Sequence, residues 1–154
     1  MKNRTGTFTL LLALALAGAG NAFAAEDSAA PDAAAAGCSE ATLHGTYLFA
    51  NDGLALSGND QIPFANAGVD VYDGNGHVRS VYTESVNGQI SRFVRVTGTY
   101  TVKSDCTGTA RYSDGTRYDQ FVAPDGSQIV FVQTNRGTVV AASESRVTAR
   151  RVGD

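Results

Sequence analysis

The sequence of 154 residues contains no tryptophan, one methionine, three prolines and only two histidines and two cysteines. His44 and His77 form no metal-binding pattern with the cysteines, and no Gly-x-Ser-x-Gly motif is present. The segment from Asp70 to Gly76 superficially resembles a calcium loop, but its Asp-Gly-Asn-Gly spacing is typical of a hairpin turn. These absences predict no metal and no cofactor, and they argue against a Ser-His-Asp hydrolase.

The chain also lacks a cluster of basic residues. Its 12 lysines and arginines are outnumbered by 15 acidic residues, which gives a formal net charge of −3. Nucleic-acid-binding domains concentrate lysine and arginine on one face, so we expect no nucleic-acid partner.

One long apolar run is present, at the start of the chain. Lys2 and Arg4 precede the run Leu10-Leu-Leu-Ala-Leu-Ala-Leu-Ala17, and Ala22-Phe-Ala24 follows it. This pattern predicts a signal peptide over 1–24, cleaved after Ala24, and a periplasmic or secreted protein. The run is too short for a membrane span, so we expect no membrane-spanning segment after cleavage.

Residues 25–37 are rich in alanine and acidic side chains and lack aromatic or β-branched residues. Such a segment cannot bury enough apolar surface to offset its ordering entropy, so we interpret it as a disordered tether before a domain at 38–154. In an exported chain the two cysteines, Cys38 and Cys106, are expected to form a disulfide.

From residue 42 onward, short runs rich in valine, threonine, tyrosine and phenylalanine alternate with turn dipeptides such as Asn87-Gly88 and Asp114-Gly115. This pattern predicts strands joined by tight hairpins. We expect strands near 43–50, 66–73, 77–86, 89–102, 107–113, 116–123, 127–134 and 138–149, with 51–65 as an irregular connection or an extra short strand.

Eight strands joined by consecutive hairpins form an antiparallel up-and-down meander. A twisted meander removes its exposed edges most completely by closing, so the predicted fold is an all-β barrel of about eight strands, with a two-sheet sandwich as the alternative. A barrel of this size either fills its interior with side chains or leaves room for one small ligand.

The strand at 89–102 contains the candidate ligand-binding residues. Arg92 and Tyr100 share the parity of the apolar residues Ile90 and Val94, and this parity would direct Arg92 into a barrel. A buried arginine needs a carboxylate, and the Asn87-Gly88 turn brings Glu84 close to it. Glu84, Arg92 and Tyr100 are therefore the predicted ligand-binding residues; the alternative is that Glu84 and Arg92 form an ordinary surface pair.

Three other charged residues lie within predicted strands: Asp119, Glu144 and Arg146. They either line the same cavity or face water. We favour water, because charged side chains on half-exposed strands usually face solvent. No catalytic residue is assigned.

Several motifs resemble a known family: Gly45-Thr-Tyr-Leu-Phe49, Pro63-Phe-Ala65 with Gly68, Tyr72-Asp-Gly-Asn-Gly76, Ser85-Val-Asn-Gly88, and Gly98-Thr-Tyr-Thr-Val102 leading to Asp105-Cys-Thr-Gly-Thr109. Over about 38–147 the chain resembles small exported bacterial proteins with an allene oxide cyclase-like, calycin-type barrel. That resemblance implies eight strands around a central cavity, in a superfamily of cyclases acting on fatty-acid-derived substrates and of binders of apolar molecules. No catalytic residue of the cyclases matches a position of this chain.

The predicted function is that of an exported barrel binding a small, partly apolar or amphipathic molecule in its interior. Two alternatives stay open at this point. One is an isomerase or cyclase using the same cavity, and the other is a structural or interaction module with a packed interior.

Overall fold

The computed structural model describes residues 37–148. A single 3-10 turn, η1, precedes eight strands, and the strands form one closed antiparallel barrel in chain order. The bounds of these elements are η1 Glu40–Thr42, β1 His44–Ser57, β2 Asp60–Asp73, β3 His77–Val86, β4 Gln89–Val102, β5 Thr107–Tyr112, β6 Arg117–Val122, β7 Gln128–Gln133 and β8 Thr138–Thr148. The predicted meander barrel is confirmed, and the sandwich alternative is wrong.

The prediction for 51–65 is wrong. Neither an irregular connection nor a separate short strand forms: this segment is the paired outer half of a long hairpin, in which β1 and β2 stay in register from His44↔Asp73 to Ser57↔Asp60. Its turn is Gly58-Asn59, with Gly58 at a φ of 63°. Glycine adopts this left-handed conformation without steric cost, which allows the two-residue reversal.

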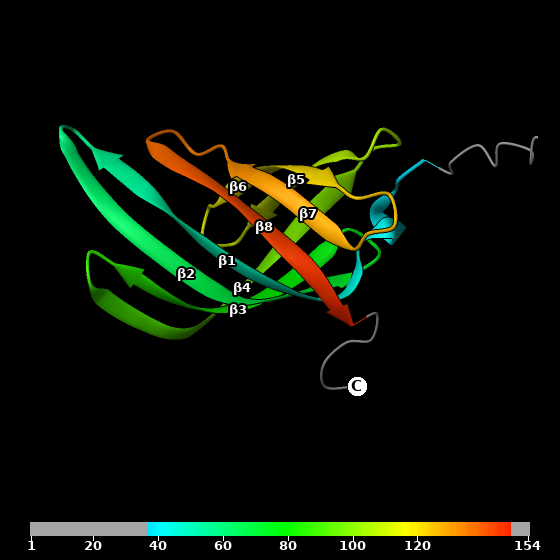
Figure 1. Cartoon of the computed structure of the whole chain (residues 1–154), viewed down its shortest axis with the longest axis horizontal. Coiled ribbons are helices and arrows are strands. Elements are labelled where there is room, and N and C mark those ends of the chain that lie inside the picture. The colour runs from blue at the N-terminus through cyan, green and yellow to red at the C-terminus, as the bar shows by residue number, and fades with distance from the viewer. Residues whose placement is uncertain (1–36, 149–154) are drawn as a thin grey trace, which may run out of the picture. The chain divides into compact units, whose positions relative to one another are not determined.

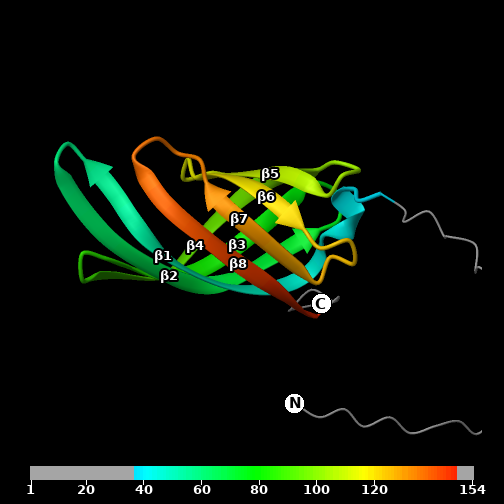
Figure 2. The same ribbon diagram turned by 45° about the horizontal axis from the view of Figure 1, so that its top comes forward.

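The two ends of the barrel differ. Figure 1 shows the β1–β2 and β3–β4 hairpins extending beyond the shorter strands β5, β6 and β7 at one end, whereas η1 lies at the other, and the turned view in Figure 2 shows the same arrangement. Among residues 37–148, no helix is long and apolar enough to cross a membrane.

The end next to η1 is packed. Leu43, Tyr47 and Tyr72 are fully buried there, and Tyr72 makes edge-to-face contacts with Tyr47 and Tyr100 at ring-centroid distances of 5.0 Å. The Tyr100 hydroxyl lies 2.9 Å from the carbonyl oxygens of both Glu40 and Leu43. This hydroxyl therefore fixes η1 to the end of the barrel.

The predicted disulfide between Cys38 and Cys106 is present and strengthens the same end. It links the segment before η1 to the turn between β4 and β5, across 68 residues of sequence. The segments predicted as signal peptide, 1–24, and as tether, 25–37, lie outside the described residues except for Gly37.

A β-bulge in β4 changes which side chains enter the barrel. Val86 pairs with Gln89 and Glu84 with Ser91, as the Asn87-Gly88 turn predicts, but the register then shifts by one residue before Tyr82 pairs with Val94. Phe93, at a φ of 51°, occupies the bulge. The extra residue reverses the inward and outward parity of the strand on its two sides.

Candidate functional site

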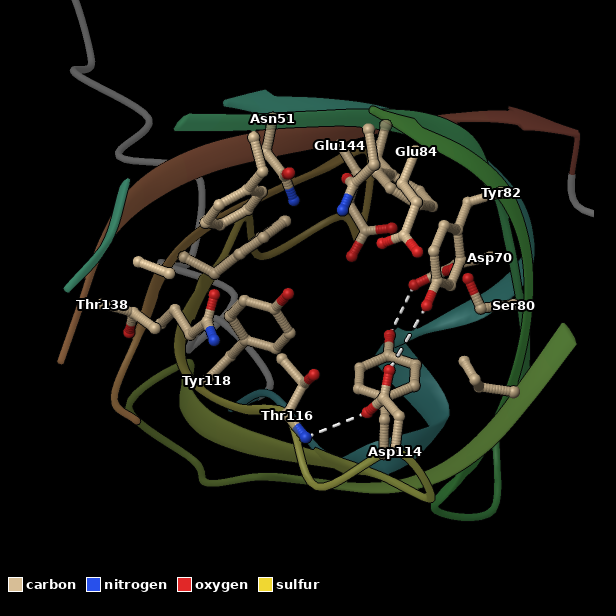
Figure 3. Close-up of a pocket in the computed structure, with 18 of the residues that line it drawn as sticks. Asn51, Asp70, Ser80, Tyr82, Glu84, Asp114, Thr116, Tyr118, Thr138 and Glu144 are labelled. Atoms are coloured by element: carbon tan, nitrogen blue, oxygen red, sulfur yellow. Dashed lines mark hydrogen bonds between the residues drawn. The ribbon is translucent and has the colours of Figure 1, made fainter. Parts of the chain in front are cut away.

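The interior at the end of the barrel opposite η1 is hollow. A cavity of about 290 Å³ lies between the strands there, bordered at its rim by Asp114 and Thr116 of the β5–β6 turn and by Thr138 at the start of β8. Figure 3 shows side chains from several strands projecting into this space. Its volume is at the lower limit of the roughly 300–1,000 Å³ typical of small-molecule sites.

The cavity wall combines aromatic and polar side chains. Its aromatic residues are Phe49, Phe64, Tyr82, Tyr112, Tyr118 and Phe131. Its carboxyl groups belong to Asp70, Glu84, Asp114 and Glu144, and its amides to Asn51, Asn66, Gln120 and Gln133. Within residues 37–148, no lysine, arginine or histidine lines this cavity.

Glu144 lies at the boundary between the hollow and packed halves. Its side chain is 2% exposed, and its Oε1 accepts a hydrogen bond of 2.6 Å from the Tyr72 hydroxyl. Tyr72 is held in turn by Tyr47 and Tyr100 on either side. The packed end therefore fixes the position of Glu144 at the floor of the cavity.

Asp70 is the second carboxyl group at this depth. It is 5% exposed, and its Oδ2 accepts a hydrogen bond of 2.5 Å from the Tyr112 hydroxyl. Ser80, which is its pairing partner on β3, points to the same carboxyl group and lowers its pKa. The alternation of each strand brings Asp70, Ser80 and Tyr112 to the interior, because paired residues share one face.

Burial raises the pKa values of both carboxyl groups. The pKa of Asp70 rises from 3.8 to about 6, mainly through loss of solvent, against the opposing effect of the Ser80 and Tyr112 hydroxyl groups. The pKa of Glu144 rises well above its usual value, first through burial and then through the negative charge of Asp70. We call Asp70 and Glu144 the carboxyl dyad; both groups ionise less readily than exposed carboxyl groups.

Several buried acceptor atoms of the wall have no hydrogen-bond partner. Each half of the dyad keeps one such oxygen, Oδ1 of Asp70 and Oε2 of Glu144. The side-chain oxygens of Asn51, Asn66 and Gln120 are also buried without a partner, and Gln120 is only 2% exposed. An unpaired buried polar atom is costly, so this group of acceptors indicates a site for a donor.

The structure separates the three residues predicted to bind a ligand. Glu84 lines the cavity, and its carboxylate enters from β3 in Figure 3. Arg92 is exposed and forms no ion pair with Glu84. The ion pair found among residues 37–148 joins His77 to Asp73. Tyr100 is 3% exposed and belongs to the packed end, outside the group that lines the cavity.

The inward orientation predicted for Arg92 is wrong because of the bulge. Without it, Arg92 would share the inward parity of Val94 and Val96, as the sequence pattern suggests. The register shift at Phe93 places Arg92 with Ile90 on the outer face, where Ile90 is 53% exposed. The predicted contact between Arg92 and Glu84 therefore does not form.

The prediction that Glu144 and Arg146 face water is also wrong. Both follow the inward parity of β8, where Glu144 pairs with Ile129 and Phe49, and Arg146 pairs with Tyr47. Arg146 does not reach the dyad as an ion pair; its Nη2 donates to the Asp125 carbonyl oxygen at 2.7 Å. Asp119 is exposed, in agreement with its prediction.

Within residues 37–148, no group of three or more His, Cys, Asp or Glu side chains is arranged to hold a metal ion. The dyad therefore offers two carboxyl groups with tyrosine donors behind them, an arrangement suited to hydrogen bonding and proton exchange.

No family model matches the sequence, and no curated protein matches it significantly. Among solved structures, a de novo designed fluorescence-activating β-barrel is similar to this chain, with 16% sequence identity, coverage of 68% of this chain and 94% of that chain, and a TM-score of 0.41. The protein is a small, disulfide-linked, eight-stranded antiparallel barrel with one hollow end.

Proposed function

We propose that the protein is exported and binds a small, partly apolar molecule in the hollow half of its barrel. The observation that carries this proposal is the cavity of about 290 Å³ whose wall holds aromatic rings together with buried acceptors lacking partners. Ligand sites are typically concave and largely apolar, with a few fixed polar groups that orient the ligand. A barrel packed along its whole length would not have this cavity.

Export is the second part of the proposal. It rests on the signal-like pattern over 1–24 and on the disulfide, since disulfides persist in oxidising compartments. The resemblance to allene oxide cyclase-like barrels also favours an interior site.

Binding is tested with tryptophol, a small neutral indole alcohol, by calorimetric titration of the disulfide-containing protein. We expect saturable binding to the wild type and a loss of at least about tenfold in Val96→Phe, because Val96 lines the cavity and a larger side chain would fill part of it. Thr97→Phe adds the same ring to the exposed outer face of the same strand and serves as the control.

If Val96→Phe does not fold, Ala55→Phe provides a second test from another part of the wall. Native mass spectrometry of the protein produced by export, before and after organic extraction, examines the same proposal without a variant. Equal affinity in Val96→Phe, Ala55→Phe and the wild type would show that binding takes place outside the cavity.

An isomerase is a second candidate, supported by the position of Asp70. A buried carboxyl group with a pKa of about 6 beside a tyrosine donor is suited to moving a proton at neutral pH. The test is deuterium incorporation from heavy water into 2-indanone, a ketone with exchangeable α protons. An enzyme would accelerate the exchange, and Asp70→Asn would abolish the acceleration.

A further inference from the structure

The charges and hydrogen-bonding groups of the cavity are strongly one-sided. Four carboxyl groups line it and, within the described residues, no basic side chain does. Asp70 and Glu144 lie at the floor, whereas Asp114 lies in the turn between β5 and β6 and is exposed at the rim. A ligand entering from the rim therefore meets acidic groups along its path.

The unpartnered buried atoms of this wall are acceptors. Oδ1 of Asp70, Oε2 of Glu144 and Oε1 of Gln120 belong to side chains that are 95% or more buried. Gln120 supports the same conclusion independently of the carboxyl groups, because its neutral amide oxygen is also a buried acceptor without a hydrogen-bond donor. Gln120 pairs with Phe131, so an aromatic ring lies next to this acceptor.

We infer that the cavity selects a primary ammonium ion joined to an apolar body: the unpartnered oxygens of Asp70, Glu144 and Gln120 receive the ammonium group, and the surrounding aromatic rings receive the body. This inference rests on the proposed function and specifies the chemical class of its ligand. An alkylammonium group carries three N–H donors and no acceptor, which complements the buried acceptors.

The aromatic residues complete the match. Tyr118 makes edge-to-face contacts with Tyr112 and Phe131, with ring centroids 6.0 and 4.9 Å apart. These three rings form one connected surface in the wall of the cavity. Such a surface buries an apolar body, and ring faces also attract a cation when water is excluded.

Anionic ligands fit this site poorly. A fatty acid carboxylate would meet Glu84, Asp114 and the dyad without a basic side chain to neutralise it. Placing like charges together in a poorly solvated site is unfavourable. The charge of the cavity therefore distinguishes it from a site for free fatty acids, although its aromatic wall would suit their chains.

The inference is tested with three indole probes of similar size but different charge: tryptamine, tryptophol and indole-3-acetate. Since the chain contains no tryptophan, indole fluorescence reports the probe alone. At neutral pH we expect tryptamine to bind at least about tenfold more tightly than tryptophol, which corresponds to a charged hydrogen-bonded contact, and indole-3-acetate to bind most weakly.

Substitutions identify the groups responsible. Glu144→Gln and Asp70→Asn should each lower tryptamine affinity at least about tenfold while changing tryptophol affinity by less than about threefold. Asp119→Asn removes one carboxyl group from the exposed outer face of β6 and should change neither affinity. Glu84→Gln supplies a less buried cavity variant if the dyad variants do not fold.

The outcomes separate this inference from the proposed function. Tryptophol or indole-3-acetate binding as tightly as tryptamine would overturn the ammonium inference and leave a binding barrel in place. A tryptamine preference that persists unchanged in all three carboxyl variants would also overturn it. No binding of any of the three probes would overturn both proposals.

Discussion

Asp70 on β2 and Glu144 on β8 share the floor of one cavity, and each accepts a hydrogen bond from a different tyrosine, Tyr112 and Tyr72 respectively. The two tyrosine hydroxyls stabilise negative charge, whereas burial and mutual repulsion oppose it. The dyad is thus a polar centre in which protonation and ligand charge are coupled.

Stability should fall as the pH rises through the pKa values of the dyad. The folded-state pKa of Asp70 is about 6 against an ordinary value of 3.8, and that of Glu144 is also raised. Between these limits the folded state holds more protons than the unfolded state, so protonation stabilises the fold at low pH and the benefit is lost as pH rises. Urea unfolding at about pH 5 and pH 8 should show this loss, on the order of 1–3 kcal/mol.

Glu144→Gln should flatten this dependence, because glutamine has no proton to lose. Asp119→Asn, on the outer face, should retain the slope of the wild type. Exposed carboxyl groups with lowered pKa values, Asp105 and Asp125, act with the opposite sign and at lower pH, below the ordinary aspartate value of 3.8. An unchanged slope in Glu144→Gln would mean that the dyad does not control stability in this range.

Tyr112→Phe should raise the pKa of Asp70 above about 6. The phenol of Tyr112 donates the 2.5 Å hydrogen bond that favours the ionised carboxylate, and phenylalanine keeps the ring without the donor. Carbon-detected NMR of the aspartate carboxyl groups follows this titration directly. Tyr118→Phe removes a hydroxyl from a neighbouring ring but leaves the Tyr112–Asp70 bond intact, so the pKa of Asp70 should move less.

The bulge at Phe93 gives a prediction with opposite signs at two positions of β4. Phe93 is 72% exposed with a φ of 51°, a conformation unfavourable for a side chain with a Cβ. Phe93→Gly should therefore raise the free energy of unfolding, by up to about 1 kcal/mol. Arg95→Gly, at an exposed position with ordinary strand geometry, should lower it by a similar amount. Destabilisation by both glycines would contradict a strained bulge.

Removing the disulfide should weaken the packed end. Cys38 and Cys106 close a loop of 68 residues, for which loop-closure entropy predicts a loss of about 4 kcal/mol. Thermal unfolding of the Cys38→Ser/Cys106→Ser double variant measures the loss, and Ser39→Ala near the same site serves as a control. Retention of full stability would mean that η1 and Tyr100 hold this end without the bridge.

The sequence predicted the number and order of the strands because turn dipeptides such as Asn87-Gly88, Asp114-Gly115 and Asp125-Gly126 mark most of the hairpins. No turn was predicted at Gly58-Asn59, so the expected strands at 43–50 and 66–73 were too short. The sequence failed to predict the inward direction of Glu144, because the apolar residues of β8 do not all lie on the face that is buried. Its outward face carries Val139 and Val147, at 61% and 53% exposure, while Glu144 and Arg146 point inward. Apolar residues outside and charged residues inside reverse the usual pattern of a half-buried strand.

The predicted orientation of Arg92 was wrong for a different reason. Its parity was interpreted correctly for a regular strand, and the pairing of residues 84–86 with 89–91 follows the predicted turn. The bulge at Phe93 has no sequence signal such as glycine, so the parity reversal was hidden. Asp70 was missed because its neighbours Val69 and Val71 make the other face of β2 appear to be the buried one.

Tryptamine affinity should rise with pH, whereas tryptophol affinity should not. The ammonium ion stays charged between pH 5 and 8, since alkylamines titrate near pH 10, so the change arises in the protein. If binding requires the ionised form of Asp70, with a pKa of about 6, affinity should increase about tenfold from pH 5 to pH 7. Fluorescence titration at each pH measures the two probes in parallel.

The remaining groups near the dyad do not account for such a change. Burial raises the pKa values of the facing tyrosines above their ordinary value of 10.0, so these groups stay protonated between pH 5 and pH 8. The facing tyrosines are Tyr47, Tyr72, Tyr112 and Tyr118. Two charged side chains, Arg146 on β8 and Glu84 on β3, also lie near the dyad. Asp70→Asn should therefore reduce the rise, and Glu84→Gln should preserve it. If the rise survives in Asp70→Asn but disappears in Glu84→Gln, the group responsible is Glu84 and not the dyad.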